Sequence, residues 1–386
     1  MRSGRATLLR SLPRSPCVVV LISAPIPPHI HFTLAQGKEK AFNFDWPSRA
    51  AFMKLKLTLM LASLMLGASM PVVHGQGVDA SEQNRRLGRG VNVLGYDPIW
   101  RSKARARFQL KHFQLLKQAG FNSVRINLYP FRRMHADENL AIEKSWFEVA
   151  DWAVQGAGDQ GLMAILDLHE YTALGQDPAG NKERFLSAWR QLATHYQSEP
   201  SSVLFEVLNE PNKALTPELW NDYLKQALAI IRQSNPTRTV IIGPAFWNSK
   251  DHLHELELPA DDTNLIVTIH YYLPMSFTHQ GASWVKENGR TGVEWLGTDQ
   301  ERDTIRQDFD KVSAWAKEHH RPIFLGEFGA YDKGPMESRA RWTAGVARAA
   351  EQHGWSWAYW QFDSDFILYD IPGDKWIEPI RQALVP

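Results

Sequence analysis

Short apolar runs rich in β-branched and aromatic residues alternate along the chain with longer segments in which apolar residues recur every three or four positions. The spacing of Trp220, Leu224 and Ala227 is typical of one helix face, and Thr216 followed by Pro217 predicts where that helix begins. The short runs predict strands. They are GVNVLG (90–95), NSVRINL (122–128), LMAILDLH (162–169), VLFEVLN (203–209), TVIIGPA (239–245), LIVTIHY (265–271), PIFLGEF (322–328) and WSWAYWQF (355–362).

Eight predicted strands that alternate with helices, with no linker or charge run between them, indicate an α/β fold. We therefore predict a closed (β/α)8 TIM barrel that forms one domain over residues 76–386. An open doubly wound sheet is the alternative. No Gly-x-Gly-x-x-Gly motif follows the first run, so nothing in the sequence favours a dinucleotide cofactor.

The segment before residue 76 has a different pattern. Lys54 and Lys56 precede an apolar run over residues 57–68, and small residues follow near Gly75. This order predicts a secretory signal peptide over residues 53–75, and the run is shorter than the roughly 18 apolar residues that span a bilayer. Residues 1–52, rich in Arg and Pro, are expected to be disordered or to precede the true start at Met53. We expect a secreted or periplasmic protein without stable membrane association.

Charge and cysteine content exclude several classes of protein. The chain has 43 Lys and Arg and 42 Asp and Glu, but residues 1–75 are basic, so acidic residues exceed basic ones by six in the remainder. A protein that binds nucleic acid needs the opposite balance, and we expect no nucleic-acid partner. The one cysteine, Cys17, lies before the predicted barrel, which therefore has no disulfide, thiol nucleophile or cysteine-bound zinc. We expect a monomer.

Polar side chains stand at the ends of six of the predicted strands. In a barrel of parallel strands these ends meet at one mouth, where such folds carry their active sites. A barrel with a purely structural role needs no polar groups there. The residues are Arg125, His169, Asn209, Glu210, His270, Tyr272, Glu327 and Trp360.

Glu210 and Glu327 stand at the ends of the fourth and seventh strands, and we expect them to face one another across the mouth. Two such carboxyl groups can divide the work of glycoside cleavage, one as a protonated acid and the other as an attacking carboxylate. Their surroundings must then hold their pKa values apart. Arg125 and the Tyr272 hydroxyl are candidates for keeping one of them ionised, and the Asn209 amide is a candidate for binding a sugar hydroxyl.

His169 and His270 also allow a metal site, because histidine and carboxylate ligands hold zinc or manganese. No His-x-His stands in the first strand and no His-Glu-x-x-His motif occurs, so we expect hydrogen-bonding histidines and neither a metal nor another cofactor. Trp360 is interpreted as a platform that stacks on a sugar ring. Trp247 and Trp284 also follow strands, and the sequence leaves them open between sugar contact and core.

These motifs resemble glycoside hydrolase family 5, in its endo-β-1,4-glucanase (cellulase) branch, from about Gly88 to Leu384. The resemblance rests on VLFEVLNEP (203–211), TIHYY (268–272), PIFLGEFGAY (322–331) and WSWAYW (355–360). It implies a retaining mechanism, with Glu210 as acid/base and Glu327 as nucleophile. It also implies that the six other strand-end residues are active-site positions. The stretch SFTHQGASW (276–284) is similar to thermophilic-type bacterial endoglucanases, some of which accept mannan, and makes His279 a further candidate for sugar contact.

Three positions depart from the family pattern. Leu94-Gly95 stands where Gly-Asn is usual, Glu170 where a second histidine is common, and Gln361 where an acid can stand. All three are expected to face sugar subsites, with Glu170 and Gln361 as weaker contact candidates, so the preferred polysaccharide stays open. The expected function is a secreted retaining endo-β-1,4-glucanase acting on cellulose-type or mixed-linkage β-glucan polysaccharides or oligosaccharides. A β-mannanase or a bifunctional glucanase/mannanase is the alternative within this chemistry. A non-catalytic carbohydrate-binding barrel would not need both acids.

Overall fold

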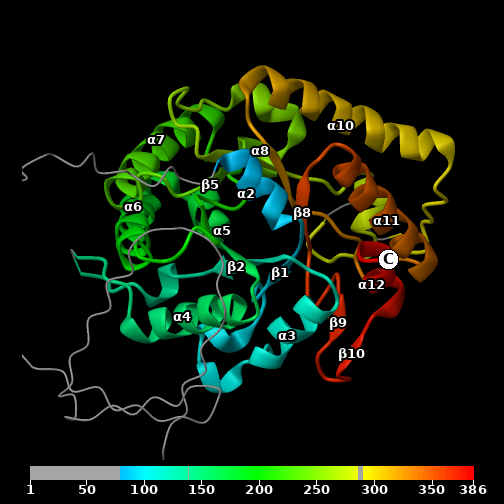
Figure 1. The fold of residues 1–386 in the computed structure, drawn as a ribbon, viewed down its shortest axis with the longest axis horizontal. Coiled ribbons are helices and arrows are strands. Elements are labelled where there is room, and N and C mark those ends of the chain that lie inside the picture. Colours follow the sequence, from blue (N-terminus) through cyan, green and yellow to red (C-terminus); the bar gives the residue numbers. More distant parts are fainter. Residues whose placement is uncertain (1–78, 138, 286–289) are drawn as a thin grey trace, which may run out of the picture. The chain divides into compact units, whose positions relative to one another are not determined.

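The computed structural model describes residues 79–137, 139–285 and 290–386, so the predicted signal peptide (53–75) and the upstream segment (1–52) lie outside the described residues. Within the described part, eight parallel strands pair in chain order and close into a barrel, as predicted (Figure 1). The strands are β1 (Arg89–Val93), β2 (Ser123–Leu128), β3 (Met163–Leu168), β4 (Val203–Glu206), β5 (Val240–Ile242), β6 (Leu265–His270), β7 (Ile323–Glu327) and β8 (Ser356–Tyr359).

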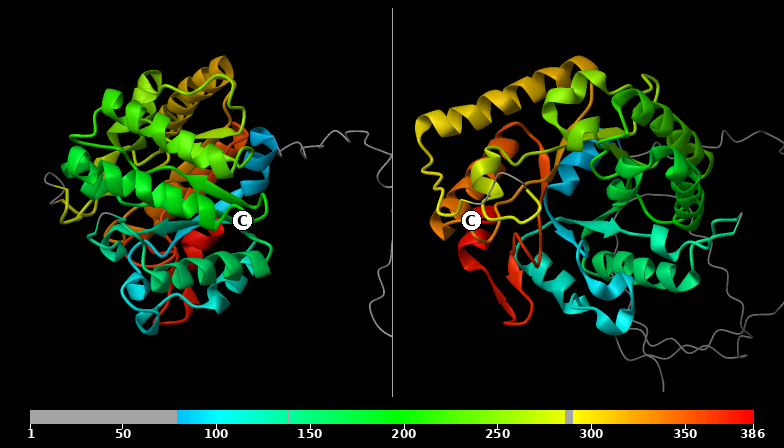
Figure 2. Two further views of the ribbon diagram at one scale, coloured as in Figure 1. Left: turned by 90° about the vertical axis from the view of Figure 1, so that its left-hand side faces the viewer. Right: turned by 180° about the vertical axis from the view of Figure 1, so that it is seen from behind.

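Helices surround this barrel (Figures 1 and 2). The longer ones are α3 (Leu110–Gln118), α4 (Lys144–Asp159), α6 (Pro178–His195), α7 (Pro217–Ser234), α10 (Asp299–His319) and α11 (Met336–Gln352), with the shorter α12 (Glu378–Leu384) after β8. Short elements in the loops are α5 (Tyr171–Gln176), α9 (Met275–Thr278), β9 (Tyr369–Asp370), β10 (Lys375–Trp376) and the 3-10 turns Pro98–Trp100, Lys103–Arg105 and Phe131–Arg133. In the described chain, no helix combines the length and apolar character that a bilayer crossing requires.

The helix α7 shows how the sequence sets these elements. The hydroxyl of Thr216 accepts a hydrogen bond from the Leu219 amide, and Pro217 occupies the first turn. Trp220, Leu224 and Ala227, which form the face that the spacing predicts, are all buried. Gly161 and Gly354, which lie two residues after the ends of α4 and α11, have φ values of +65° and +73°, where a side chain would be strained.

The link between β5 and β6 differs from the predicted alternation of strands and helices. It holds α8 (Ala245–Asn248), whose Phe246 and Trp247 have left-handed backbone angles, and the 3-10 turn Lys250–Glu255. The apolar spacing that specifies the other outer helices is missing from the stretch between residues 249 and 257, where most residues are charged or histidine.

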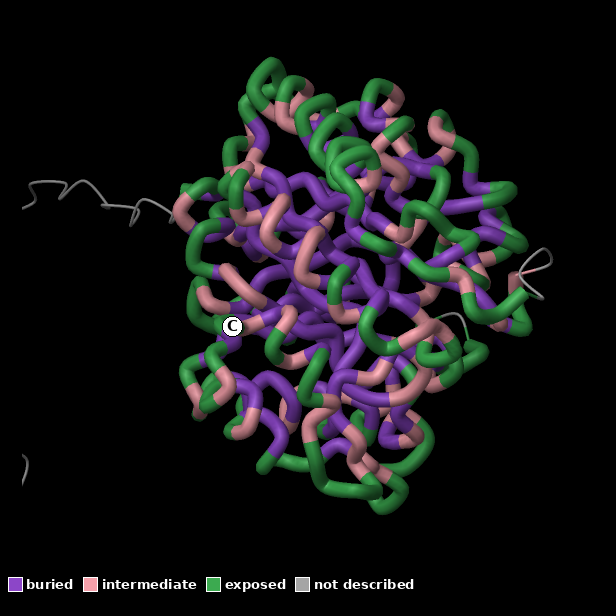
Figure 3. The backbone as a smooth tube through the Cα atoms, turned by 90° about the vertical axis from the view of Figure 1, so that its right-hand side faces the viewer, coloured by how far each residue is buried: buried purple, intermediate pink, exposed green. Residues whose placement is uncertain are grey.

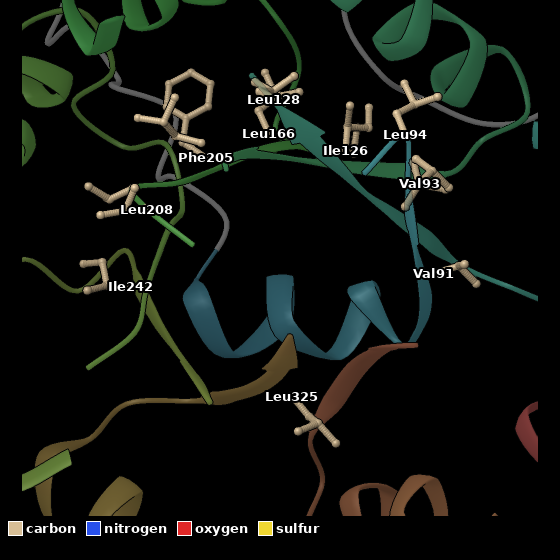
Figure 4. Packing of buried hydrophobic residues seen from close by; sticks show 14 of the residues in the cluster. Val91, Val93, Leu94, Ile126, Leu128, Leu166, Phe205, Leu208, Ile242 and Leu325 are labelled. Carbon is tan, nitrogen blue, oxygen red and sulfur yellow. The ribbon is translucent and has the colours of Figure 1, made fainter. Parts of the chain in front are cut away.

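The barrel interior is built in layers. Its lower layer is apolar and is closed by α2 (Ala80–Leu87), whose buried Leu87 joins Ile165, Ile266 and Phe324 in one cluster. Figure 4 shows α2 beside the strands of the barrel, and Figure 3 shows buried residues in the interior and exposed residues around the outside. Above this layer lie polar side chains with no exposed surface, which include Asn92, Arg125, Asn127, Asp167 and Glu206. These polar groups form the floor of the mouth.

Candidate active site

A cavity opens at the carboxyl ends of the barrel strands. It brings together most of the strand-end residues that the sequence predicts, and Arg125 and His270 lie buried directly beneath it. The side chains that line it are Tyr96, His169, Tyr171, Asn209, Glu210, Tyr272, His279, Trp284, Glu327, Trp360 and Phe366.

The guanidinium group of Arg125 is the central cation of the site. Its Nε and Nη2 donate to both oxygens of Glu206, at 2.7 and 2.8 Å. Its Nη1 donates to Glu327 Oε1 at 2.8 Å, and Nη2 also donates to Asn209 Oδ1 at 2.8 Å. The bidentate contact with Glu206 fixes the plane of the guanidinium, so Nη1 is aimed at Glu327.

The two expected catalytic acids differ in their partners. Burial raises the pKa of Glu327 to about 7, opposed by the charge of Arg125 and by a hydrogen bond that the Tyr272 hydroxyl donates at 3.0 Å. The pKa of Glu210 is raised well above its usual value, first by burial and next by the negative charge of Glu327. Glu327 therefore loses its proton first, and Glu210 keeps its proton while Glu327 is charged.

His169 is fixed from below by Asp167, whose Oδ2 lies 2.6 Å from His169 Nδ1. Burial lowers the pKa of His169, so the ring is neutral. Burial alone would raise the pKa of Asp167, but interactions with Arg125 and His169 together have a larger effect. The pKa of Asp167 is therefore lower than its usual value. Asp167 is thus a carboxylate that accepts the Nδ1 proton of His169, and Nε2 is left as a hydrogen-bond acceptor.

Trp360 presents a flat surface at the floor of the cavity. Its ring is parallel to that of His169, with the ring centres 5.5 Å apart, and perpendicular to Tyr96 at 5.9 Å. Only 5% of the residue is exposed, and the peptide bond that follows it is cis. His169 and Tyr96 therefore hold the Trp360 ring in place from two sides, as is needed for a ring that stacks on a sugar.

The weaker candidates divide into two groups. His279 and Trp284 line the cavity, and Trp284 is half exposed. Trp247 is 45% exposed but lies outside the lining residues. Its backbone N–H donates to the carbonyl of Pro211, directly after Glu210, so Trp247 stands beside the acid/base loop.

None of the three departures from the family pattern is among the described residues that line the cavity. Gln361 is fully buried, and both of its amide atoms lack a partner. Glu170 accepts a hydrogen bond from the Phe131 amide at 2.6 Å and does not line the cavity. Leu94 is buried at a φ of +66°.

Sequence reasoning missed two sets of residues. Tyr96, Tyr171 and Phe366 line the cavity from loops after β1, β3 and β8, and the spacing of aromatic residues in loops gives little indication of this. Asp167 and Glu206 lie under the cavity and could have been found, because each is a lone charge inside an otherwise apolar run. A charge in a buried strand is expected only where it is paired.

One set of described side chains could hold a metal ion. A ligand atom from each of Glu210, His270 and Glu327 lies within 4.8 Å of the others. The oxygens of Glu327 already have protein partners in Arg125 and Tyr272. Two carboxyl groups that share one histidine are equally the arrangement of an acid–base pair.

A larger groove, of about 600 Å³, lies outside the barrel mouth and shares no lining residue with the cavity there. It runs between α7 and the segment before β6, and Leu224, Arg232 and Pro259 are among its lining residues. None of the described residues that line it is aromatic or a histidine, whereas the cavity at the barrel mouth is lined by both kinds of side chain.

Comparison with known proteins agrees with this geometry. The model of the cellulase family (glycosyl hydrolase family 5) matches residues 85–365. Endoglucanase H of Acetivibrio thermocellus is 31% identical over 76% of this chain. The structure of Cel5A from Thermotoga maritima in complex with cellobiose is 38% identical, with a TM-score of 0.76, over 80% of this chain and all of that one. A mannotriose complex of the same enzyme gives a TM-score of 0.75 at 38% identity, over 80% of this chain and all of that one.

The chain spans only part of some relatives. It covers 32% of the length of Endoglucanase H and 52% of Endoglucanase 3 of Fibrobacter succinogenes, to which it is 26% identical over 77% of its own length.

The contact between Tyr272 and Glu327 can be tested without a substrate. Replacing Tyr272 by Phe removes a hydrogen bond to the charged form of Glu327 and should raise its pKa. A hydrogen bond to a charged group contributes about 1.5–3 kcal/mol, so the increase should be about one pH unit or more. A ¹³C NMR titration of glutamate carboxyl carbons, with Glu327 assigned by Glu327→Gln, measures it. The distant Tyr223→Phe serves as the control, and an unchanged pKa in Tyr272→Phe would refute this role.

Proposed function

The chain belongs to glycosyl hydrolase family 5, and on this basis we propose that it is a secreted retaining endo-β-1,4-glucanase. Its substrates are cellulose-type or mixed-linkage β-glucans, cleaved at internal bonds. The observation that carries the proposal is the unequal environment of two facing carboxyl groups, Glu210 and Glu327.

The separation of these groups favours retention of configuration. A carboxyl oxygen of Glu210 and one of Glu327 lie within 4.8 Å of each other. Retaining enzymes hold their carboxyl groups about 5–5.5 Å apart, whereas inverting enzymes need about 6.5–9.5 Å to admit a water molecule. In the proposed reaction Glu327 attacks the anomeric carbon while Glu210 protonates the departing oxygen.

The same pair explains how Glu210 changes its role. While Glu327 is a carboxylate, its charge helps to hold the proton on Glu210. Formation of the glycosyl ester, in which Glu210 gives up its proton, removes the charge of Glu327. The pKa of Glu210 therefore falls. Glu210 then acts as the base that activates water and releases the sugar from Glu327.

The substrate class rests on the flat and polar surfaces of the mouth. Trp360 and Trp284 offer aromatic faces, and Asn209 and His169 offer polar groups beside the acids. Cellobiose is bound in one of the solved structures reported above, which supports a glucan substrate. Mannotriose is bound in another, so a β-mannanase or a bifunctional glucanase/mannanase is the second candidate.

Secretion is proposed from the segment over residues 53–75, which has the charge and apolar pattern of a signal peptide. N-terminal sequencing of the exported protein should give a first residue shortly after position 75. A first residue before Met53 would contradict this proposal.

Substitution of each acid should separate the two roles. Glu327→Ala should abolish turnover of every substrate, because no group remains to form the ester. Glu210→Gln should greatly slow polysaccharide hydrolysis, since acid–base assistance is worth about 10²–10⁴-fold. It should largely spare the first step on an aryl cellobioside whose leaving group needs no protonation, as a burst of released phenol would show.

The exposed Glu257, outside the mouth, provides the control, and Glu257→Gln should behave as the unaltered enzyme. Substantial hydrolysis by Glu327→Ala would refute the nucleophile assignment. An equal loss on both substrates in Glu210→Gln would refute the acid assignment.

Parallel rate measurements on carboxymethylcellulose, lichenan and glucomannan should separate the candidate substrates. We expect carboxymethylcellulose and lichenan to be cleaved, with a rapid fall in viscosity that indicates internal cleavage. Activity confined to glucomannan would replace the glucanase proposal with the mannanase one.

A further inference from the structure

The loop after β5 has an unusual backbone. Phe246, Trp247 and Asn248 are consecutive and have φ values of 56°, 60° and 54°. Residues with a side chain rarely adopt this left-handed conformation, and asparagine does so most readily. Three such residues in succession persist only where their surroundings hold them, which is a feature of functional sites.

Contacts to the loop after β4 and to β6 hold this turn in place. The Trp247 amide donates to the carbonyl of Pro211, and Ser249 pairs with His270 of β6 as a parallel bridge. Gly243 provides the space for Asn248, because a Cβ atom at residue 243 would lie 2.1 Å from Asn248 Oδ1. The turn therefore delivers the Asn248 amide, which has no exposed surface, to the side of His270.

His270 stands between this amide and the two acids. Its Nε2 lies 3.2 Å from Asn248 Nδ2. Its Nδ1 lies 2.9 Å from Glu210 Oε1 and 3.5 Å from Glu327 Oε2. Burial, followed by the charge of Arg125, lowers the pKa of His270 well below its usual value, so the ring carries one proton.

The position of that proton matters for Glu210. With the proton on Nδ1, His270 donates to Glu210 Oε1, and the acid proton of Glu210 remains on its other oxygen. With the proton on Nε2, Nδ1 becomes an acceptor and competes with the substrate for the proton of Glu210. The orientation of Asn248 favours the first state, because an NH₂ group that faces Nε2 requires a lone pair there.

The reverse orientation of the amide is less favourable. As placed, Asn248 leaves one acceptor, Oδ1, without a partner. Rotation of the amide would instead leave its N–H donors beside Gly243, and buried donors without partners are rarer than buried acceptors without partners.

We propose that Asn248 is a positioning residue that fixes His270 as the Nδ1–H tautomer, so that Glu210 keeps its proton for the glycosidic oxygen. The consequence for the role of Glu210 in catalysis rests on the proposed function, whereas the tautomer of His270 does not depend on it. The titratable and charged groups that face His270 are Glu210 after β4, Glu327 of β7, Arg125 of β2 and His169 after β3. Asn248 is the neutral partner on the remaining side.

Two variants distinguish the effect of the Asn248 side-chain amide from the effect of the backbone conformation at residue 248. Asn248→Gly removes the side chain and still tolerates a positive φ. Asn248→Asp keeps the shape but, when ionised, presents only acceptor oxygens to the ring, so Nε2 must then carry a proton. Asn235→Asp is the matched control, because it also replaces a buried amide, which donates to the carbonyl of Ala193 outside the site.

The first readout is the ring itself. In protein labelled with ¹⁵N-histidine, with His270 assigned by His270→Gln, we expect a protonated Nδ1 and a bare Nε2 in the unaltered enzyme and in the Asn235→Asp control. Asn248→Asp should show a protonated Nε2, and Asn248→Gly should lose the strict preference. A protonated Nε2 in the unaltered enzyme, or a bare Nε2 in Asn248→Asp, would overturn the proposal whether or not the protein hydrolyses glucan.

The second readout is kcat/KM for aryl cellobiosides with poor and good leaving groups. Asn248→Asp should lose at least about tenfold on the poor leaving group, a part of the 10²–10⁴-fold that a general acid supplies. It should lose much less on the good one, and Asn248→Gly should lie between it and the unaltered enzyme. Equal losses on both substrates would overturn the link to Glu210. Inactivity of the unaltered enzyme on both would instead refute the proposed function.

Discussion

The site depends on one buried cation. Arg125 has no exposed surface, yet its guanidinium donates to Glu206, Glu327, Asn209 and Asn92. Loss of one partner from a buried ion pair costs about 3–5 kcal/mol, because the other charge is left without compensation. The polar layer inside the barrel therefore has to be complete, and it holds Arg125 in the one orientation that reaches the carboxylate of Glu327.

This constraint makes two chemically identical side chains different. Glu327 has a cation and a hydroxyl donor, whereas Glu210 has a neutral histidine and faces the charge of Glu327. The different surroundings at the two positions in the barrel thus give the two carboxyl groups different pKa values. Neutral histidines complete the arrangement: His169 is fixed by Asp167, and His270 contacts both acids.

Much of this could be predicted from sequence, for a physical reason. Parallel strands bring their carboxyl ends to one mouth, so a polar residue that ends an apolar run, such as His169 or Glu327, predicts its own location. The link after β5 could not be predicted, because the left-handed turn at Phe246 depends on contacts with Pro211 and His270, which are distant in sequence. The placement of Gln361 could not be predicted either, because its neighbour Trp360 lines the cavity while Gln361 is fully buried and lies outside the lining.

The central claim is that the carboxylate held by Arg125 is the one that attacks the sugar. A 2-deoxy-2-fluoro cellobioside with a good leaving group slows release of the glycosyl-enzyme and allows the ester to accumulate. Peptide mapping of the trapped enzyme by mass spectrometry measures the claim most directly. The account predicts one added disaccharide on the peptide that contains Glu327. A label on Glu210, or turnover that inverts the anomeric centre without any trapped ester, would contradict it.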